Sequence, residues 1–137
     1  MKRQTLYLRK YDWIVYVFYD TMTEDAHTII NVLKHLGCSK KGIIRSYKNI
    51  NKGNNNAGLT YSNPRLRESV ISLGHASSLA EFLNTWQHEI THLCRHICEY
   101  FQIGPFSEEA AYLSGDIAKK MHPMLIGYTC KCGKCKY

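Results

Sequence analysis

The stretch "NTWQHEITHLCRHICEYF", Asn84 to Phe101, contains the pattern H-E-x-x-H at His88, Glu89 and His92. Residues four apart on a helix lie one above the other on the same face, so two imidazoles can approach one point, as zinc requires. Glu89 lies about 100° further round a helix, where its carboxylate can reach a metal-bound water without binding the metal. The spacing therefore predicts a hydrolytic zinc (Zn2+) site with Glu89 as general base.

A catalytic zinc has three protein ligands and one open position, so a third ligand is needed. The segment "FSEEAAYLSGDIAKK" returns Glu108 and Glu109 on a second helix after the turn at Gly104-Pro105. We expect Glu108 as the ligand, with Glu109 as the alternate. Tyr112 shares a face with Glu108 and could lie over the metal and contact substrate. Acidic residues also favour the first turn of any helix, which by itself explains one of the two glutamates.

The elements that position these residues can be predicted from local patterns. A long helix is expected from Leu79 to about Gln102, because Ser78 with Glu81 fits a capping box and no Gly or Pro interrupts it. A last helix follows from Glu108 to about Met121, stopped by Pro123. A helix after Thr23 ends at Gly37, and strands are expected at Tyr11–Tyr19, Ile43–Tyr47, Leu59–Tyr61 and "RESVISLG".

The predicted order is β-α-β-β-β-α-α, which defines an α+β fold class. It consists of a small mixed β-sheet with an N-terminal helix, the long H-E-x-x-H helix and a following C-terminal helix. The 137 residues are expected to form one domain, 1–137, in which residues 121–137 are a Cys/Lys-rich C-terminal tail. The apolar stripe of the long helix is expected to be core: Leu79, Phe82, Leu83, Trp86, Ile90, Leu93 and Ile97.

Two segments, "VISLGHASSLAEFLNTWQHEITHL" and "SEEAAYLSGDI", resemble a minimal zincin of the gluzincin type. The chain is also similar to small H-E-x-x-H proteins encoded in bacteriophage and bacterial genomes. The resemblance covers roughly residues 70–119. It implies zinc held by the two motif histidines and by Glu108 or Glu109, with Glu89 as base. It also implies that the strand before the motif helix, Ser69–Leu73, is a sheet edge that pairs with a peptide or protein substrate by strand addition.

Other polar residues could assist such chemistry. Tyr112, His75 and His96 are candidates for stabilising an oxyanion. His96 continues the stripe of the motif histidines and could orient one of them. Alternatively, it belongs to a polar patch on a partly exposed helix.

Six cysteines are present, and their distribution is not that of a disulfide framework. Cys94 and Cys98 are read as small buried hydrophobes. The tail residues Cys130, Cys132 and Cys135 could chelate a second zinc, with Cys38 or His122 as a fourth ligand. The alternative is a flexible basic tail with exposed thiols. The C-x-C-x-x-C pattern is compatible with both interpretations.

The net charge is +7, and the basic residues gather in "KRQTLYLRK", "SKKGIIRSYK" and the tail. No recognised nucleic-acid motif accompanies them, so nucleic acid is not expected as a partner. No apolar run approaches the ~20 residues of a membrane span, and no membrane association is expected. The N-terminus weakly resembles a signal peptide, with basic residues before the apolar run Trp13–Tyr19, but Asp20 breaks the run and no small-residue cleavage site follows. The expected location is therefore the cytoplasm or a virion.

The leading hypothesis is a zinc-dependent peptidase or amide hydrolase that uses a metal-activated water with Glu89 as base. The alternative is a zincin-fold structural component of a larger assembly such as a phage virion, with or without bound zinc. Assembly partners of this kind would be proteins. A nucleic-acid-binding module is the third possibility.

Overall fold

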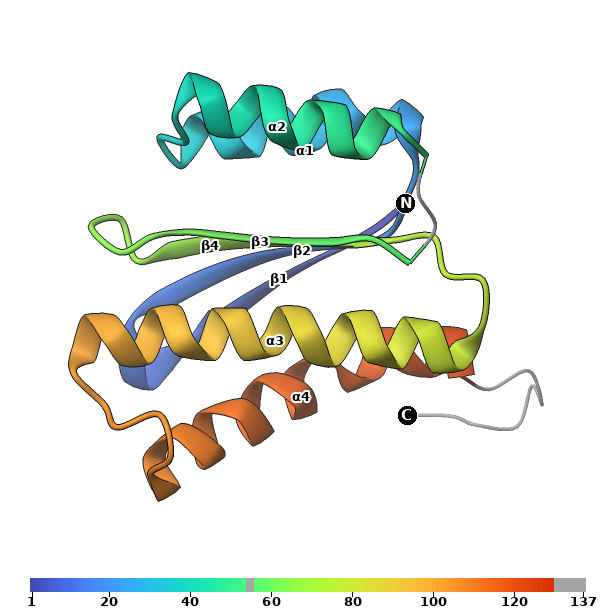
Figure 1. Ribbon diagram of the computed structural model, residues 1–137. Coiled ribbons are helices and arrows are strands. Elements are labelled where there is room, and N and C mark those ends of the chain that lie inside the picture. Colours follow the sequence, from blue (N-terminus) through green and yellow to red (C-terminus); the bar gives the residue numbers. More distant parts are fainter. Residues whose placement is uncertain (54–55, 130–137) are drawn as a thin grey trace.

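The computed structural model describes residues 1–53 and 56–129. It shows an α+β fold in which a mixed four-stranded sheet lies between two pairs of helices (Figure 1). The elements in chain order are β1 (Lys2–Leu8), β2 (Trp13–Thr21), α1 (Ala26–His35), α2 (Lys40–Asn51), β3 (Gly58–Asn63), β4 (Glu68–Gly74), α3 (Leu79–Phe101) and α4 (Glu108–Thr129), with short 3-10 turns at Arg9–Tyr11 and Thr23–Asp25.

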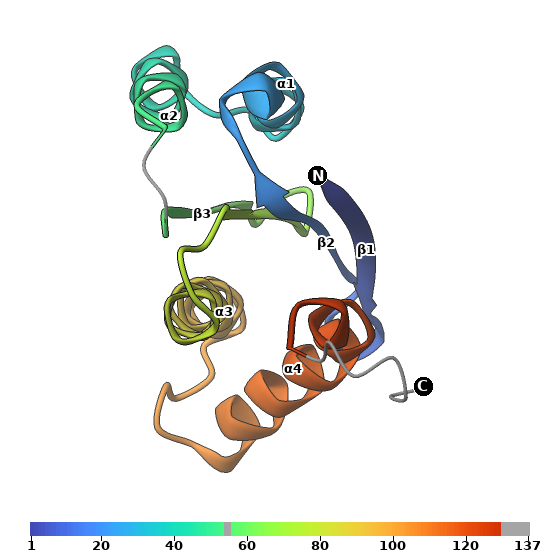
Figure 2. The same cartoon turned by 90° about the vertical axis from the view of Figure 1, so that its right-hand side faces the viewer.

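Helices α1 and α2 cover one face of the sheet, and α3 and α4 cover the other (Figure 2). Each face has its own apolar core. The α3/α4 side is built around Trp13, Ile71, Ile90 and Leu93, all at most 1% exposed. The α1/α2 side is a smaller cluster: Phe18, Ile29, Ile30, Leu33, Leu36 and Val70.

The strand order is β1-β2-β4-β3, with β2 and β4 parallel and the other two pairs antiparallel. Strand β4 contains Ser69–Leu73 and pairs with β2 on one side and β3 on the other. The expectation that Ser69–Leu73 is a sheet edge open to a peptide is therefore wrong, because neighbouring strands take its backbone hydrogen bonds on both sides. The edges are β1 and β3.

Strand β1 was not predicted from the sequence. Lys2 and Arg3 at the start of the strand are charged and exposed, and within β1 only Leu6 and Leu8 are buried. Its whole length is held by antiparallel pairing with β2, from Lys2 opposite Tyr19 to Leu8 opposite Trp13. A short alternation of this kind is a weak local signal, so the partner strand decides it.

The strand predicted at Ile43–Tyr47 is wrong, because this segment lies inside helix α2. The Ser39 hydroxyl caps the helix by accepting a hydrogen bond from the Gly42 backbone N–H at 3.1 Å. Ile43 and Ile50, seven residues apart on one face, pack against the α1 cluster. Burial of that face overrides the local β preference of Ile43-Ile44.

Helix α3 matches its predicted range closely, and the Ser78 hydroxyl accepts from the Glu81 N–H at 3.2 Å. Phe82, Ile90, Leu93 and Ile97 of the predicted stripe are buried. The prediction that Leu79 and Leu83 are core is wrong: they lie four residues apart on a solvent-facing side of the helix and are 45% and 40% exposed.

Helix α4 does not stop at Pro123. It continues to Thr129, so residues 121–129 are helical rather than the start of a tail. Met121 and Leu125 are buried on either side of Pro123, and their packing holds the helix through the residue that lacks an N–H. No helix in the described ranges is long and apolar enough to cross a membrane.

Candidate functional site

Helix α3 brings the two motif histidines together. The Nε2 atoms of His88 and His92 lie 3.0 Å apart, and the rings meet edge to face with centroids 4.6 Å apart. His88 is exposed and His92 half-buried. Two nitrogen ligands at ~2.0–2.1 Å from a tetrahedral zinc lie about 3.3–3.4 Å apart. A small rotation of the rings would therefore admit the ion, so this pair fits two zinc ligand positions.

Glu89 points from α3 toward the sheet. It is 5% exposed, and its Oε2 accepts a hydrogen bond of 2.6 Å from the hydroxyl of Thr60 on the edge strand β3. Gly58, two residues earlier on β3, lies over the same carboxylate. A Cβ on Gly58 would overlap Oε1 of Glu89 and lie 2.7 Å from its carboxyl carbon. The Glu89 carboxylate is thus held between the Thr60 hydroxyl and the backbone of Gly58.

His96 is bound to the sheet by a chain of hydrogen bonds. The Trp13 indole N–H donates to Ser69 Oγ at 2.8 Å, Ser69 and Ser62 hydroxyls lie 2.6 Å apart, and Ser62 Oγ lies 2.8 Å from His96 Nδ1. The indole N–H can only donate, whereas the two hydroxyls and the His96 ring nitrogen can each act as donor or acceptor. Burial, then the nearby His92, lowers the pKa of His96 and keeps it neutral. Its ring centroid is 6.4 Å from that of His92.

These contacts belong to a polar seam between α3 and β3, in which Thr85, Glu89 and His96 meet Asn56, Thr60 and Ser62. Another contact of this seam is the hydrogen bond of 3.0 Å that the Thr85 hydroxyl donates to the Asn56 backbone carbonyl. The strand residues alternate with period two and the helix residues share one face. The sequence motifs did not single out Gly58, Thr60 and Ser62 as site residues. The alternation of small or polar residues along "GLTYSN" is the signal that could have identified them.

The predicted third ligand does not join the histidines. Glu109 Oε1 lies 3.1 Å from Lys10 Nζ and accepts a hydrogen bond of 3.2 Å from the Tyr11 hydroxyl, on the turn between β1 and β2. The Lys10 ammonium holds the pKa of Glu109 below its ordinary value. Glu108 is exposed at the start of α4. Within residues 1–53 and 56–129, no three His, Cys, Asp or Glu side chains are grouped to hold a metal ion.

The packing of α4 explains this separation. Cys94 of α3 contacts Ser114 of α4 through a side-chain hydrogen bond. Cys94 follows His92 by two residues, which is about 200° round the helix. Helix α4 therefore lies on the opposite flank of α3 from the histidine pair. Tyr112 is also on α4 and is 76% exposed, so it does not cover the motif.

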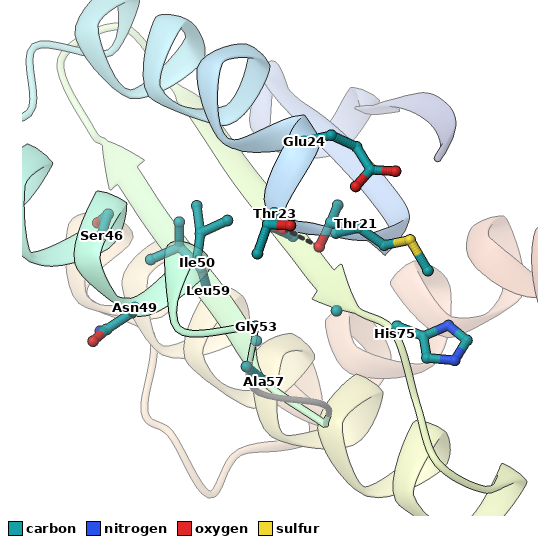
Figure 3. Close-up of a pocket in the computed structure, with 14 residues that line it drawn as sticks. Thr21, Thr23, Glu24, Ser46, Asn49, Ile50, Gly53, Ala57, Leu59 and His75 are labelled. Carbon is teal, nitrogen blue, oxygen red and sulfur yellow. Dashed lines mark hydrogen bonds between the residues drawn. The ribbon is translucent and has the colours of Figure 1, made fainter.

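His75 follows the end of β4 and is paired with Asp20. Its Nδ1 lies 2.6 Å from Asp20 Oδ1, and Asp20 has a positive φ of 57° next to a register shift in β2. His75 lines a cavity of ≈ 280 Å³ on the α1/α2 side of the sheet. Figure 3 shows this cavity between Ser46, Asn49 and Ile50 of α2 and the segment Thr21–Glu24. The motif histidines do not line it.

Some of the predictions about cysteines concern described residues and others concern the tail. Cys94 and Cys98 are buried, which confirms that they are core residues. Burial raises the pKa of the Cys94 thiol to about 11 and also raises that of Cys98. Cys38 is half-buried and His122 exposed. The predicted second zinc site at Cys130, Cys132 and Cys135 lies outside the described residues.

Comparison with known proteins adds no relative: no family model, curated protein or solved structure matches the chain. The functional argument therefore depends on the residues and their geometry.

Proposed function

We propose that the chain is a zinc-dependent peptidase or amide hydrolase whose metal is held by His88 and His92, with Glu89 as general base. The observation that carries the proposal is the 3.0 Å approach of the Nε2 atoms of His88 and His92 on one face of α3. Imidazole nitrogens are common zinc ligands, and the two rings need only a small rotation to reach the ligand spacing of a tetrahedral site, which supports the proposal.

The residues of the chain have distinct parts in this proposal. A bound zinc would lower the pKa of its water to about 7 and polarise a substrate carbonyl. Thr60 donates to Oε2 of Glu89 and fixes the carboxylate, so Oε1 is the oxygen that would accept a proton. Gly58, the first residue of β3, leaves room for that oxygen because it has no side chain.

The described residues supply two of the three protein ligands that a catalytic zinc takes. The proposal requires one more, and neither Glu108 nor Glu109 is placed to serve. The tail cysteines are chemically competent thiolate ligands, so the experiment separates them from the histidines.

The test is the metal content of purified protein by elemental mass spectrometry. Four proteins are compared: wild type, His88→Ala, the triple variant Cys130→Ser/Cys132→Ser/Cys135→Ser, and His27→Ala as a control histidine on α1. About one zinc per chain in wild type and His27→Ala, lost in His88→Ala, supports the proposal. Loss in the cysteine variant as well would identify the tail as the source of the missing ligand. Zinc that survives His88→Ala, or none after reconstitution, contradicts it.

Activity is tested next with a peptide library. Wild type is expected to cleave, whereas Glu89→Gln should retain zinc and lose cleavage, because the amide cannot accept the proton.

A second candidate is a zincin-fold structural component of a larger assembly, such as a phage particle. The burial of Glu89 and its use in the polar seam favour it, since a carboxylate that ties α3 to β3 has a role without catalysis. This candidate predicts stoichiometric co-purification with other proteins, and no hydrolysis by zinc-loaded protein.

A further inference from the structure

Helix α2 carries four cations in one row. Lys41, Arg45, Lys48 and Lys52 are spaced by four, three and four residues, and all four are exposed. Residues at these intervals share one face of a helix. With a rise of 1.5 Å per residue the row is about 16 Å long. We refer to these four residues as the α2 cation row. The row exists only because Ile43–Tyr47 is helical, since a strand would send successive side chains to alternate faces.

The chain on either side of the row carries no acidic residue for many positions. From Ala26 to Arg67 the sequence has no Asp or Glu, while Lys34 and Lys40 add two further cations to the same helical layer. Within the described residues, no ion pair involves any member of the row. The nearest acids in sequence are Asp25, which accepts a hydrogen bond from the Met22 N–H, and Glu68, which lies 3.0 Å from His35. Glu24 lines the cavity beside α2. Cations left unpaired in this way form a single-sign field that attracts an extended anion.

The face of α2 opposite the cation row packs against the protein core. Ile43 and Ile50 pack against the core cluster of α1, and Ile44, 55% exposed, is the aliphatic side chain of the helix that remains open to solvent. Tyr47, 41% exposed, lies on the same helix, with the His27 ring centroid 6.4 Å from its own. Exposed aromatic rings beside cations are the combination that tracks a phosphate backbone and stacks on bases.

We propose that the α1/α2 layer binds the phosphodiester backbone of nucleic acid without sequence preference, through the α2 cation row. This surface lies on the face of the sheet opposite α3 (Figure 2), so it functions independently of the motif histidines. The interaction is electrostatic, and its strength must therefore fall with salt by about one unit of log–log slope for each cation that contacts a phosphate.

The experiment measures fluorescence anisotropy of a labelled 20-base-pair DNA duplex, and of its single strand, over a series of salt concentrations. The test variant is Lys41→Gln/Arg45→Gln/Lys48→Gln/Lys52→Gln. Glutamine is a good helix former, and circular dichroism checks that α2 is retained. The matched control neutralises four exposed cations elsewhere: Arg9, Arg65, Arg95 and Lys119, each to Gln. Both variants lower the net charge by the same amount.

Wild type and control are expected to bind, and the row variant should lose about four units of slope and about 100-fold in affinity at low salt. Three outcomes overturn the proposal: no binding by wild type to either probe at low salt, equal loss in the control, or binding that the row variant leaves unchanged. Anionic vesicles are the last probe. Binding to vesicles that depends on the row, without binding to either DNA, would assign the surface to membranes and overturn the proposal too.

Discussion

The Glu89 carboxylate occupies the space that a side chain on Gly58 would need. Gly58 begins the edge strand, and Glu89 is in the middle of α3, so one missing Cβ determines how closely helix and strand approach. Gly58→Ala is expected to destabilise the fold by about 1–3 kcal/mol, the usual cost of overpacking. Chemical denaturation measures this.

Gly115→Ala is the matched control, because a Cβ there meets nothing within 4 Å and alanine favours the helix. It should be neutral or slightly stabilising. In a Glu89→Ala background the cost of Gly58→Ala should largely vanish, because the two residues are coupled. Additive losses would show that the overlap is relieved elsewhere.

Thr60→Val is expected to destabilise the protein by about 1.5–3 kcal/mol, the range for a hydrogen bond to a charged group. The valine has nearly the same shape but leaves Glu89 Oε2 buried without its donor. Thr60→Ser keeps the hydroxyl and should cost less. Equal unfolding free energies for Thr60→Val and wild type would mean that water replaces the threonine hydroxyl.

The contact between Lys10 and Glu109 should be visible in a pH titration. Lys10 lowers the pKa of Glu109, so the carboxylate stays charged to lower pH than usual. Its contribution to stability is present above the unfolded-state pKa of a glutamate and is lost as pH falls through the lower folded-state pKa. NMR titration of the Glu109 side chain is expected to show this shift.

Lys10→Met should raise the pKa of Glu109 back toward its ordinary value. Addition of zinc to wild type should leave the Glu109 signal unchanged. A zinc-dependent shift at Glu109 would instead place this residue in the metal site.

The thiols of Cys94 and Cys98 should resist alkylation in the folded protein. With a pKa of about 11, about one Cys94 thiol in a thousand is ionised at pH 8, and the residue is also buried. Iodoacetamide labelling followed by peptide mapping should show both residues protected under native conditions and labelled in guanidinium. Half-buried Cys38 is the internal reference. Native labelling of Cys94 as fast as Cys38 would indicate that α4 separates readily from α3.

The amino-acid sequence by itself determined what depends on neighbours along the chain. Helix α3 is fixed by its cap at Ser78 and its uninterrupted apolar stripe. The approach of His88 to His92 then follows from helix geometry, because residues four apart share a face. The burial of Cys94 and Cys98 follows from the same pattern.

Tertiary packing decided the rest. Helix α4 lies against the Cys94 flank of α3, which takes Glu109 to Lys10 rather than to the histidines. Strand β3, not β4, became the sheet edge and brought Gly58 and Thr60 to Glu89. The Ile43–Tyr47 segment became helix because Ile43 and Ile50 could be buried together, and this aligned the α2 cation row. Contacts between residues far apart in sequence fix each of these features, and no local propensity specifies which distant partner is available.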